Sequence, residues 1–484
     1  MRAAVAAFAL LAGVLAGCGS PEAHQVPGQA TAYGLWGHNA AGELEVPPES
    51  ANLAVRLLPL GEQGYEPTLG ITSGGTLLVA GGEATVWRSA DRGRTWTDVS
   101  DHLLREDQDP YLWLDPATDR VFSAPNQVAC ADVRWSVDGG LTWKPVLPLV
   151  RVPQPTPTGG CGGVGHDHQS LVAGPPVDPG SARGYPNTLY YTFNARSLQG
   201  TFLTRSFDGG ASWEPVSRRV FEPDCQIGLN GAPAVGPDGT LYVPKPGCSG
   251  LLIAVSRDGG VMWQHHALEA AGMGGGTQAM PGLTTYSTNP AVAVDEEGNA
   301  FVLWAGEDGL LHLSHSEDRG VNWSAPVVAT PPHVRVTAFS ALTAGAEGRL
   351  AFAYVGASAD PAAWAAREAH FAPAGTAWHL MVGLTLDGLA ADPTFTTVQA
   401  TPPEDPVQVG CIWQAGDAGP LTHCRNLRDF LSIVEHEGRA VVAFADGCRR
   451  CASQEDSTRA DLTLAVVDAG PGLRGGRLAP YLSA

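Results

Sequence analysis

Ser89-Ala-Asp91-Arg-Gly93-Arg-Thr95-Trp96 is the first of five copies of one short motif in this chain. The other copies are Ser136-Val-Asp138-Gly-Gly140-Leu-Thr142-Trp143, Ser206-Phe-Asp208-Gly-Gly210-Ala-Ser212-Trp213, Ser256-Arg-Asp258-Gly-Gly260-Val-Met262-Trp263 and Ser316-Glu-Asp318-Arg-Gly320-Val-Asn322-Trp323. Serine, aspartate, glycine and tryptophan hold the same places in all five. Five matches in one chain make chance a poor explanation, so a repeated structural unit is expected.

Each motif has the chemistry of a tight turn between two strands. The Asp and Ser side chains hydrogen-bond to nearby backbone groups. The Gly adopts a positive φ at low cost, and the Trp packs as a large apolar anchor where the next strand begins. We therefore expect these side chains to build the fold and not to contact a ligand. They are Asp91, Trp96, Asp138, Trp143, Asp208, Trp213, Asp258, Trp263, Asp318 and Trp323.

The spacing of the motifs predicts a β-propeller. The motif aspartates are separated by 47, 70, 50 and 60 residues, which is the range of a four-stranded blade with variable loops. A second repeat, two apolar strands joined by a Gly turn, lies upstream of each motif. It occurs twice more, beginning at Ser340 and at Leu431. The prediction is an all-β chain forming a single propeller with seven blades, of which the last two lack the motif. Six blades is the alternative.

The motif resembles the Asp-box, or bacterial neuraminidase repeat, and residues 60 to 470 resemble the sialidase-like superfamily of Asp-box propellers. Sialidases of that superfamily have six blades and clamp the substrate carboxylate with three arginines. They use a Tyr nucleophile with a Glu partner, and an Asp acid/base. The family's Arg-Ile-Pro signature before the first Asp-box is absent here, where the chain reads Gly64-Tyr65-Glu66-Pro67-Thr68-Leu69. No catalytic residue can be carried over, so the catalytic residues stay unassigned.

Two classes of function remain open. A complete scaffold without a recognisable catalytic set favours a module that binds a glycan or a protein through loops at one face, without sialidase activity. The alternative is a glycoside hydrolase of exo-α-sialidase type, or another carbohydrate-active enzyme, acting from the propeller mouth. Hydrolysis predicts an arginine cluster or paired carboxylates. Binding predicts exposed aromatic side chains, with Trp36, Trp113, Trp364 and Trp413 as candidates.

A polar residue recurs where each inner strand of the propeller is expected to begin. Equivalent positions of inner strands surround the channel of a propeller, so these side chains are expected to converge at its mouth. They are Glu66, Asp109, Asp167, Asn230, Asn289 and Asp429. The alternative is that each residue only caps a turn.

Converging carboxylates and amides are the oxygen ligands that Ca²⁺ or Mg²⁺ prefers. Asp109, Asp167 and Asp429 are therefore candidate metal ligands, and Ca²⁺ is the one candidate cofactor. His166 and His168 add candidate transition-metal ligands. The same ring would suit a cationic or polyhydroxylated ligand.

The N-terminus resembles a bacterial lipoprotein signal. Met1-Arg2 carries positive charge, an apolar run extends from Ala3 to Val14, and Leu15-Ala16-Gly17-Cys18 follows. The resemblance implies that residues 1–17 are removed and that Cys18 is lipidated, anchoring the protein to the bacterial cell membrane and facing the outside or the periplasm. An ordinary signal peptide with an incidental Cys is the alternative. Residues 18–50 are then a flexible tether, and residues 51–484 form the propeller.

Eight further cysteines form an even set, which in an exported chain suggests disulfide bonds. Pairing between neighbours gives Cys130–Cys161, Cys225–Cys248, Cys411–Cys424 and Cys448–Cys451. The last four could pair otherwise, and a zinc site is the alternative for Cys448 and Cys451.

The net charge of −20 over 484 residues argues against a nucleic-acid partner. A nucleic-acid-binding protein needs a basic face that displaces phosphate counterions. The charge suits a soluble, exposed domain, which is expected to be monomeric.

Overall fold

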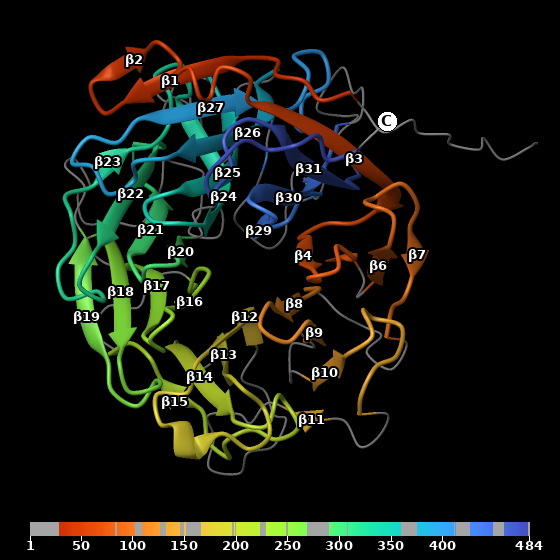
Figure 1. Cartoon of the computed structure of the whole chain (residues 1–484), viewed down its shortest axis with the longest axis vertical. Helices are drawn as coiled ribbons and strands as arrows, with labels where there is room; N and C mark the ends of the chain where they lie inside the picture. Colours follow the sequence, from red (N-terminus) through yellow and green to blue (C-terminus); the bar gives the residue numbers. More distant parts are fainter. Residues whose placement is uncertain are drawn as a thin grey trace, which may run out of the picture.

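The chain folds as an all-β propeller. The computed structural model describes residues 29–82, 85–101, 109–125, 132–145, 150–151, 166–195, 198, 200–222, 229–247, 250–268, 290–306, 308–359, 375–410, 412, 426–448 and 459–482. In these residues the strands form seven sheets, six with four strands and one with seven. The sheets stand around a central axis (Figure 1). They match the seven units of the sequence, so the predicted fold class is confirmed.

Each blade runs from an inner strand at the axis to an outer strand at the rim. The inner strands of blades 1 to 7 are β4 (Thr68–Ile71), β8 (Leu112–Asp115), β12 (His166–Gly174), β16 (Ala234–Val235), β20 (Ala291–Val294), β24 (Val336–Ala344) and β29 (Ser432–His436). The second strands are β5 (Leu77–Gly81), β9 (Arg120–Ser123), β13 (Thr188–Ala195), β17 (Leu241–Gly247), β21 (Ala300–Ala305), β25 (Leu350–Ala357) and β30 (Arg439–Asp446). The third strands are β6 (Thr85–Ser89), β10 (Asp132–Ser136), β14 (Gly200–Ser206), β18 (Gly250–Ser256), β22 (Leu311–Ser316), β26 (Ala377–Thr385) and β31 (Asp461–Ala469). The outer strands are β7 (Thr97–Asp98), β11 (Val150–Arg151), β15 (Arg218–Arg219), β19 (Gln264–Leu268), β23 (Val327–Val328), β27 (Phe395–Gln399) and β3 (Ala54–Gln63).

The ring is closed by a strand from the start of the chain. β3 forms the outer strand of blade 7, where it pairs with β31 from Ala54↔Ala469 to Gln63↔Asp461. Two chain ends far apart in sequence therefore share one sheet. Opening the ring requires breaking that ladder, so closure stabilises every blade at once.

The predicted tether is wrong in its second half. Within residues 18–50, β1 (Leu35–Asn39) and β2 (Gly42–Leu44) form strands that extend the rim of blade 6. β1 pairs with β27, and His38 on β1 is fully buried. The Gly, Ala and Pro content of this segment predicted a tether. The strand pair forms through tertiary contacts, which composition alone does not reveal.

The apolar core is divided among the seven contacts between neighbouring blades. Each of seven buried clusters draws its side chains mainly from two adjacent blades. Middle strands must therefore be apolar on both faces, and all eight residues of β13 and of β25 are buried. This explains the continuous apolar run of β25, whereas β13 also buries the polar Thr192 and Asn194.

The five predicted turns form with the predicted chemistry. In the first, Ser89 Oγ accepts the Gly93 N–H at 2.8 Å and donates to Asp91 Oδ1 at 2.7 Å. Asp91 Oδ1 also accepts the Thr95 N–H at 2.9 Å. The same three bonds recur in the other four copies. The fifth residue of each copy is a Gly with φ between 75° and 88°, a conformation that L side chains rarely adopt.

The motif tryptophans pack against the clusters between blades. Trp143 is 8% exposed and its Nε1–H donates to the Val99 carbonyl at 2.8 Å. Trp96, Trp213 and Trp263 pack on three other clusters, and Trp323 packs likewise. The contacts of the motif residues are therefore structural, as predicted.

Blade 6 retains a variant of the turn that the sequence pattern missed. Thr385 Oγ1 donates to Asp387 Oδ1 at 2.8 Å, and the Thr394 N–H donates to the same oxygen at 3.0 Å. Thr replaces Ser here, and the later residues do not match the motif. Blade 6 has therefore lost the motif, as predicted, but keeps two of its hydrogen bonds.

Several predictions about export fall outside the described residues. These include the signal segment, Cys18 and seven of the eight cysteines predicted to form disulfides. Cys448 is buried at 1% exposure and takes part in a disulfide, but the predicted pairings stay predictions. Among the described residues, no helix combines the length and the apolar character needed to cross a membrane. The one helical element in them is a 3₁₀ turn, η1 (Pro179–Ser181).

Candidate functional site at the mouth of the central channel

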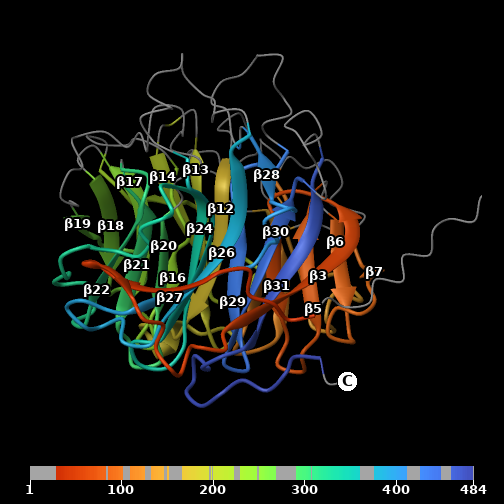
Figure 2. The same cartoon turned by 90° about the horizontal axis from the view of Figure 1, so that it is seen from above.

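The inner strands of the blades surround a channel along the axis. Its cavity volume is about 260 Å³. The lining combines apolar side chains with polar groups at one end, which include Thr68, His168 and Asn230. Strands within a blade are antiparallel, so the starts of inner strands lie at the face opposite the five turns, which follow third strands (Figure 2). The predicted ring therefore lies at one mouth of the channel.

Four of the predicted carboxylates lie close together at this mouth. The Asp429 backbone N–H donates to Glu66 Oε1 at 3.2 Å, which joins blade 7 to blade 1. The charges of Asp429, Asp109 and Asp167 all act on the Glu66 carboxyl. His168 Nε2 lies 3.9 Å from Asp429 Oδ2. Glu66, Asp109, Asp167, His168 and Asp429 are called the mouth cluster below.

Glu66 is the most deeply buried acid of the mouth cluster. It is 1% exposed, and its Oε2 has no hydrogen-bond partner among the described residues. Burial raises the pKa of Glu66 well above its usual range, and the nearby charges of Asp429, Asp109 and Asp167 raise it further. Arg428, which lies over the Tyr65 ring at 4.3 Å, offsets part of this effect. The environment therefore favours the neutral carboxyl, which can donate a hydrogen bond.

His168 has the opposite protonation preference to Glu66. Burial lowers the pKa of His168, but the Asp429 carboxylate 3.9 Å away and the charges of Asp167 and Asp109 outweigh burial, so the net shift is upward. The mouth cluster thus contains an acid that resists ionisation and an imidazole that favours it. Two groups with opposed protonation preferences lie within one buried site.

The predicted register of the ring is off by one residue in blade 3. A bulge between Asp167 and Ser170 interrupts the pairing of β12 with β13. His168 has φ 46°, the same left-handed conformation as Glu66 at 48° and Phe339 at 54°. Each of these three lies two residues before the point where regular pairing with the second strand begins or resumes. His168, not Asp167, is therefore the counterpart of Glu66, because a bulge adds one residue and shifts the faces.

Asn230 has a structural role in a buried hydrogen-bond chain. Lys245 Nζ donates to Thr201 Oγ1 at 3.1 Å, and Thr201 Oγ1 donates to Asn194 Oδ1 at 2.9 Å. Asn194 Nδ2 donates to Asn230 Oδ1 at 2.6 Å, and Asn230 Nδ2 donates to the His168 carbonyl at 3.3 Å. The amide of Asn230 is thus occupied in joining blades 3 and 4 behind the mouth. Asn289 lies outside the described residues.

The predicted metal site finds no support in the described part of the chain. No three or more His, Cys, Asp or Glu side chains in it are arranged to hold a metal ion. Asp109, Asp167 and Asp429 are neighbours, but the calcium site stays a prediction. His166 stacks on Phe193 at 4.0 Å, and burial lowers its pKa to about 4, so it behaves as a neutral core side chain.

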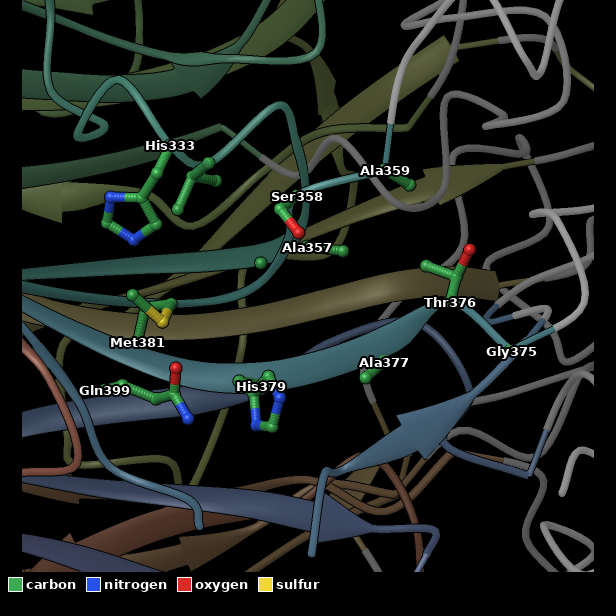
Figure 3. Close-up of a pocket in the computed structure, with 12 residues that line it drawn as sticks. His333, Ala357, Ser358, Ala359, Gly375, Thr376, Ala377, His379, Met381 and Gln399 are labelled. Carbon is green, nitrogen blue, oxygen red and sulfur yellow. The ribbon is translucent and has the colours of Figure 1, made fainter. Parts of the chain in front are cut away.

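A second pocket, which sequence reasoning missed, lies at the contact between blades 5 and 6. Its cavity volume is about 590 Å³, and its lining includes His333, His379, Met381 and Gln399 (Figure 3). His333 precedes β24, whereas the others lie on β26 and β27. No repeated spacing in the sequence joins these positions. Of the predicted aromatic platforms, Trp36 packs against His333 at 4.0 Å, and Trp113 packs between blades 2 and 3 and lines the channel cavity. Trp364 and Trp413 lie outside the described residues, so they stay predictions.

No protein-family model matches the sequence, and no curated protein matches it. Solved structures are similar in fold. YCF48 bound to a D1 peptide is 12% identical, with a TM-score of 0.41, covering 74% of this chain and 100% of that one. An alpha-L-arabinanase of Penicillium chrysogenum complexed with arabinobiose is 16% identical, with a TM-score of 0.39, covering 65% and 94%. A mutant of the NanB sialidase of Streptococcus pneumoniae is 11% identical, with a TM-score of 0.37, covering 84% and 68%. These similarities are too low to indicate a ligand, which must be inferred from this chain's own residues.

Proposed function

We propose that this protein is a ligand-binding propeller whose mouth cluster takes a cationic group of its ligand. The group is an ammonium or guanidinium, as on a basic polypeptide or an amino sugar. The observation that carries the proposal is Glu66: a carboxyl that is 1% exposed, has one oxygen without a partner in the described part of the chain, and lies among three other carboxyls. A cation would satisfy that oxygen and relieve the repulsion among the carboxylates.

The negative charge of the mouth cluster favours cationic ligands over carboxylate ligands. A carboxylate substrate such as a sialic acid would enter a cluster of like charges and lose its hydration there. A cation gains from the same cluster. Asp109 is the partly exposed acid of the cluster, so it marks the side from which a ligand arrives.

Proton release is the expected signature of this binding. An incoming cation lowers the pKa of Glu66, and it also lowers that of His168, so both groups favour losing a proton. Calorimetric titration of acetyl-tetralysine amide at pH 7, in two buffers with different ionisation enthalpies, measures the protons released. The neutral tetraserine analogue and glucosamine separate a charge-driven polypeptide site from a site for amino sugars.

Variants make the test specific to the mouth cluster. Asp109→Asn and Asp429→Asn should each weaken the binding of tetralysine by about tenfold, which corresponds to about 1.4 kcal/mol. Glu317→Gln removes one charge from an Asp-box turn where the side chain is 65% exposed, and should leave binding unchanged. Equal weakening by all three variants would mean attraction by overall charge and would refute a mouth site.

Glycoside hydrolysis is the second candidate, because Glu66 and its neighbours pair a neutral acid with carboxylates. Such a pair can protonate a leaving group and stabilise or attack the sugar. Release of nitrophenol from a panel of aryl glycosides would detect it. Hydrolysis that disappears in Glu66→Gln supports the enzyme. Tetralysine binding without any hydrolysis leaves the binding module as the function.

The proposal places the propeller at the bacterial cell surface through Cys18, whose sequence context supports lipidation. Growth with an alkyne-bearing fatty acid should label the wild-type protein and not Cys18→Ser, and the variant should move from the membrane fraction to the soluble one. Retention of Cys18→Ser in membranes without label would contradict the anchor.

A further inference from the structure

The pocket between blades 5 and 6 has the size and form of a small-ligand site. Its volume of about 590 Å³ falls within the range of roughly 300–1,000 Å³ that is usual for such sites. It lies at the end of the apolar cluster shared by the two blades, since Met381 and Val334 belong both to that cluster and to the lining. It is lined by described residues of blade 6 and of the connection before β24.

The polar groups of this pocket are uncharged. Burial lowers the pKa of His333, an effect that the charge of Glu43 offsets in part, and burial lowers the pKa of His379, so both imidazoles favour the neutral form. The other polar side chains of the lining are hydroxyls and one amide, on Ser358, Thr376 and Gln399. No described residue of the lining is a carboxylate, lysine or arginine, although the chain as a whole carries a net charge of −20.

Neighbouring groups hold two of these side chains in place. His379 Nδ1 lies 3.1 Å from Thr401 Oγ1, and Gln399 Nε2 donates to the Thr401 carbonyl at 2.9 Å. In the described structure this leaves His379 Nε2 and Gln399 Oε1 without hydrogen bonds. Figure 3 shows the two side chains next to each other on β26 and β27, beside Met381.

The other side of the pocket offers a further unpaired polar atom. His333 Nδ1 is buried and has no hydrogen-bond partner among the described residues. Its ring packs against Trp36 of β1, at 4.0 Å between ring centroids, so its orientation is set by packing. Buried polar atoms are costly unless they are hydrogen-bonded, and a ligand can supply the missing partner.

We infer that this pocket binds an uncharged carbohydrate ring. Sugar hydroxyls both donate and accept hydrogen bonds, as neutral imidazoles and hydroxyls do, and Gln399 Oε1 accepts. Met381, Ala357 and Ala377 supply apolar surface for the C–H face of the ring. A charged group would lose its hydration, and no described residue of the lining would supply a counterion, so acidic and amino sugars are disfavoured. This site is separate from the mouth cluster and does not depend on the function proposed for it.

Methyl NMR gives a probe at the site itself. The chain has five methionines, of which Met381 lines the pocket and Met262 is 73% exposed on an Asp-box turn of blade 4. Full-length protein labelled with ¹³C at the methionine methyl groups is titrated with the methyl glycosides of glucose, galactose and mannose, up to about 20 mM, which covers the millimolar range of weak sites. Met381→Leu assigns the signal. At least one glycoside should shift the Met381 signal saturably while Met262 stays unchanged.

Matched compounds and variants test the inferred chemistry. Glucuronic acid and glucosamine should bind at least tenfold more weakly than the responding neutral glycoside. His379→Phe keeps an aromatic ring without the nitrogens, so the ligand loses its hydrogen bonds to His379. Binding should weaken about tenfold, which corresponds to about 1.4 kcal/mol of binding free energy. His266→Phe, on the outer strand β19, should bind like wild type, and Glu66→Gln should as well.

Three results would overturn the inference. They are the absence of any Met381 shift with all three glycosides, a shift that His379→Phe leaves unchanged, and charged sugars that bind as well as neutral ones. A cooperative thermal unfolding transition in each variant shows that the propeller is folded. A failure here leaves tetralysine binding at the mouth cluster untouched, so the two proposals fail separately.

Discussion

The backbone N–H of Asp429 donates a hydrogen bond of 3.2 Å to Oε1 of Glu66, across 363 residues of sequence. This bond spans the contact at which the last blade meets the first. It holds one oxygen of the acid, while Oε2 has no partner in the residues that the structure describes. The closure of the ring therefore places a buried acid in a defined position at the channel mouth, and the protonation of that acid depends on what enters.

Glu66→Gln should make the protein more stable than wild type at pH 7. The folded-state pKa of Glu66 is raised, so above pH 4.5 the unfolded chain loses a proton that the folded chain keeps. Wild-type stability then falls as pH rises above the unfolded pKa. Gln keeps the shape and the acceptor for the Asp429 N–H. A gain of about 1 kcal/mol or more is expected at pH 7, since one pKa unit corresponds to about 1.4 kcal/mol.

Urea unfolding at pH 4 and at pH 7 measures this effect. The difference between Glu66→Gln and wild type should grow with pH, whereas the exposed control Glu317→Gln should show a difference that is equal at the two values. A Gln variant that is less stable than wild type at pH 7 would mean that the ionised form is the native one.

The convergence at the mouth could be predicted from sequence because blades repeat, but the individual partners could not. Counting back from each inner strand brought Glu66, Asp109, Asp167 and Asp429 to one end of the channel. The count misplaced His168, because a β-bulge adds a residue without a signal in the sequence. It also could not show that the Asn230 amide is already occupied by Asn194.

Lys245→Met should stabilise the protein at neutral pH. Burial, with a smaller effect of Arg219, lowers the pKa of Lys245 to about 8, and the side chain is 2% exposed. Between pH 8 and 10.5 the unfolded chain binds a proton that the folded chain does not, so wild-type stability rises over this range by about 3 kcal/mol. Lys245→Met cannot titrate at this position, so its stability should not rise in this way between pH 8 and 10.5. The gain at pH 7 is about 1–3 kcal/mol, after loss of the hydrogen bond to Thr201.

Thermal unfolding at pH 7 and pH 9.5 separates this effect from packing. Lys144→Met, at an exposed position, should change stability equally at both values. If Lys245→Met destabilised the protein at pH 7, the hydrogen-bond chain that starts at Lys245 would outweigh the cost of burying the charge.

Asp318→Ala should cost about 1 kcal/mol, which is typical of lost hydrogen bonds at a partly exposed turn. Asp318 accepts bonds from Ser316, Val321 and Asn322. The backbone bond from Asn322 is the main cause that lowers the Asp318 pKa to about 2, so its contribution is present above the unfolded pKa of 3.8 and is lost as pH falls through about 2. Asp387→Ala in the blade 6 variant should cost less, because fewer donors reach it. Equal losses in urea unfolding would contradict a ranking by bond number.

The blades and turns were predictable because their chemistry is local, whereas β1 and the pocket between blades 5 and 6 were not. Ser89, Asp91 and Gly93 lie within five residues, so their bonds can be read from a short pattern. Trp36 and His333 meet across almost 300 residues of chain, and neither belongs to a repeat. Contacts of that kind arise only when the ring is assembled.

His38→Gln should reduce the acid sensitivity of the protein and show that β1 is part of the cooperative fold. His38 is fully buried, its Nε2 lies 3.0 Å from the Ala329 carbonyl, and its ring stacks on Phe395. Burial lowers the pKa of His38 to about 4. Below pH 6.5, His38 binds a proton in the unfolded chain but not in the folded chain. Wild-type stability is therefore lost as pH falls from 6.5 toward 4.

Gln can donate the same bond to Ala329 without ever becoming charged. Relative to wild type, His38→Gln should therefore gain about 2 kcal/mol between pH 7 and pH 5, because 1.5 pH units below the unfolded pKa correspond to about that free energy. Trp36→Phe on the same strand does not titrate and should shift urea unfolding equally at the two pH values. If His38→Gln behaved like Trp36→Phe, β1 would detach before the propeller unfolds. The pKa of His38 would then be the same before and after global unfolding, and it could not make global stability depend on pH.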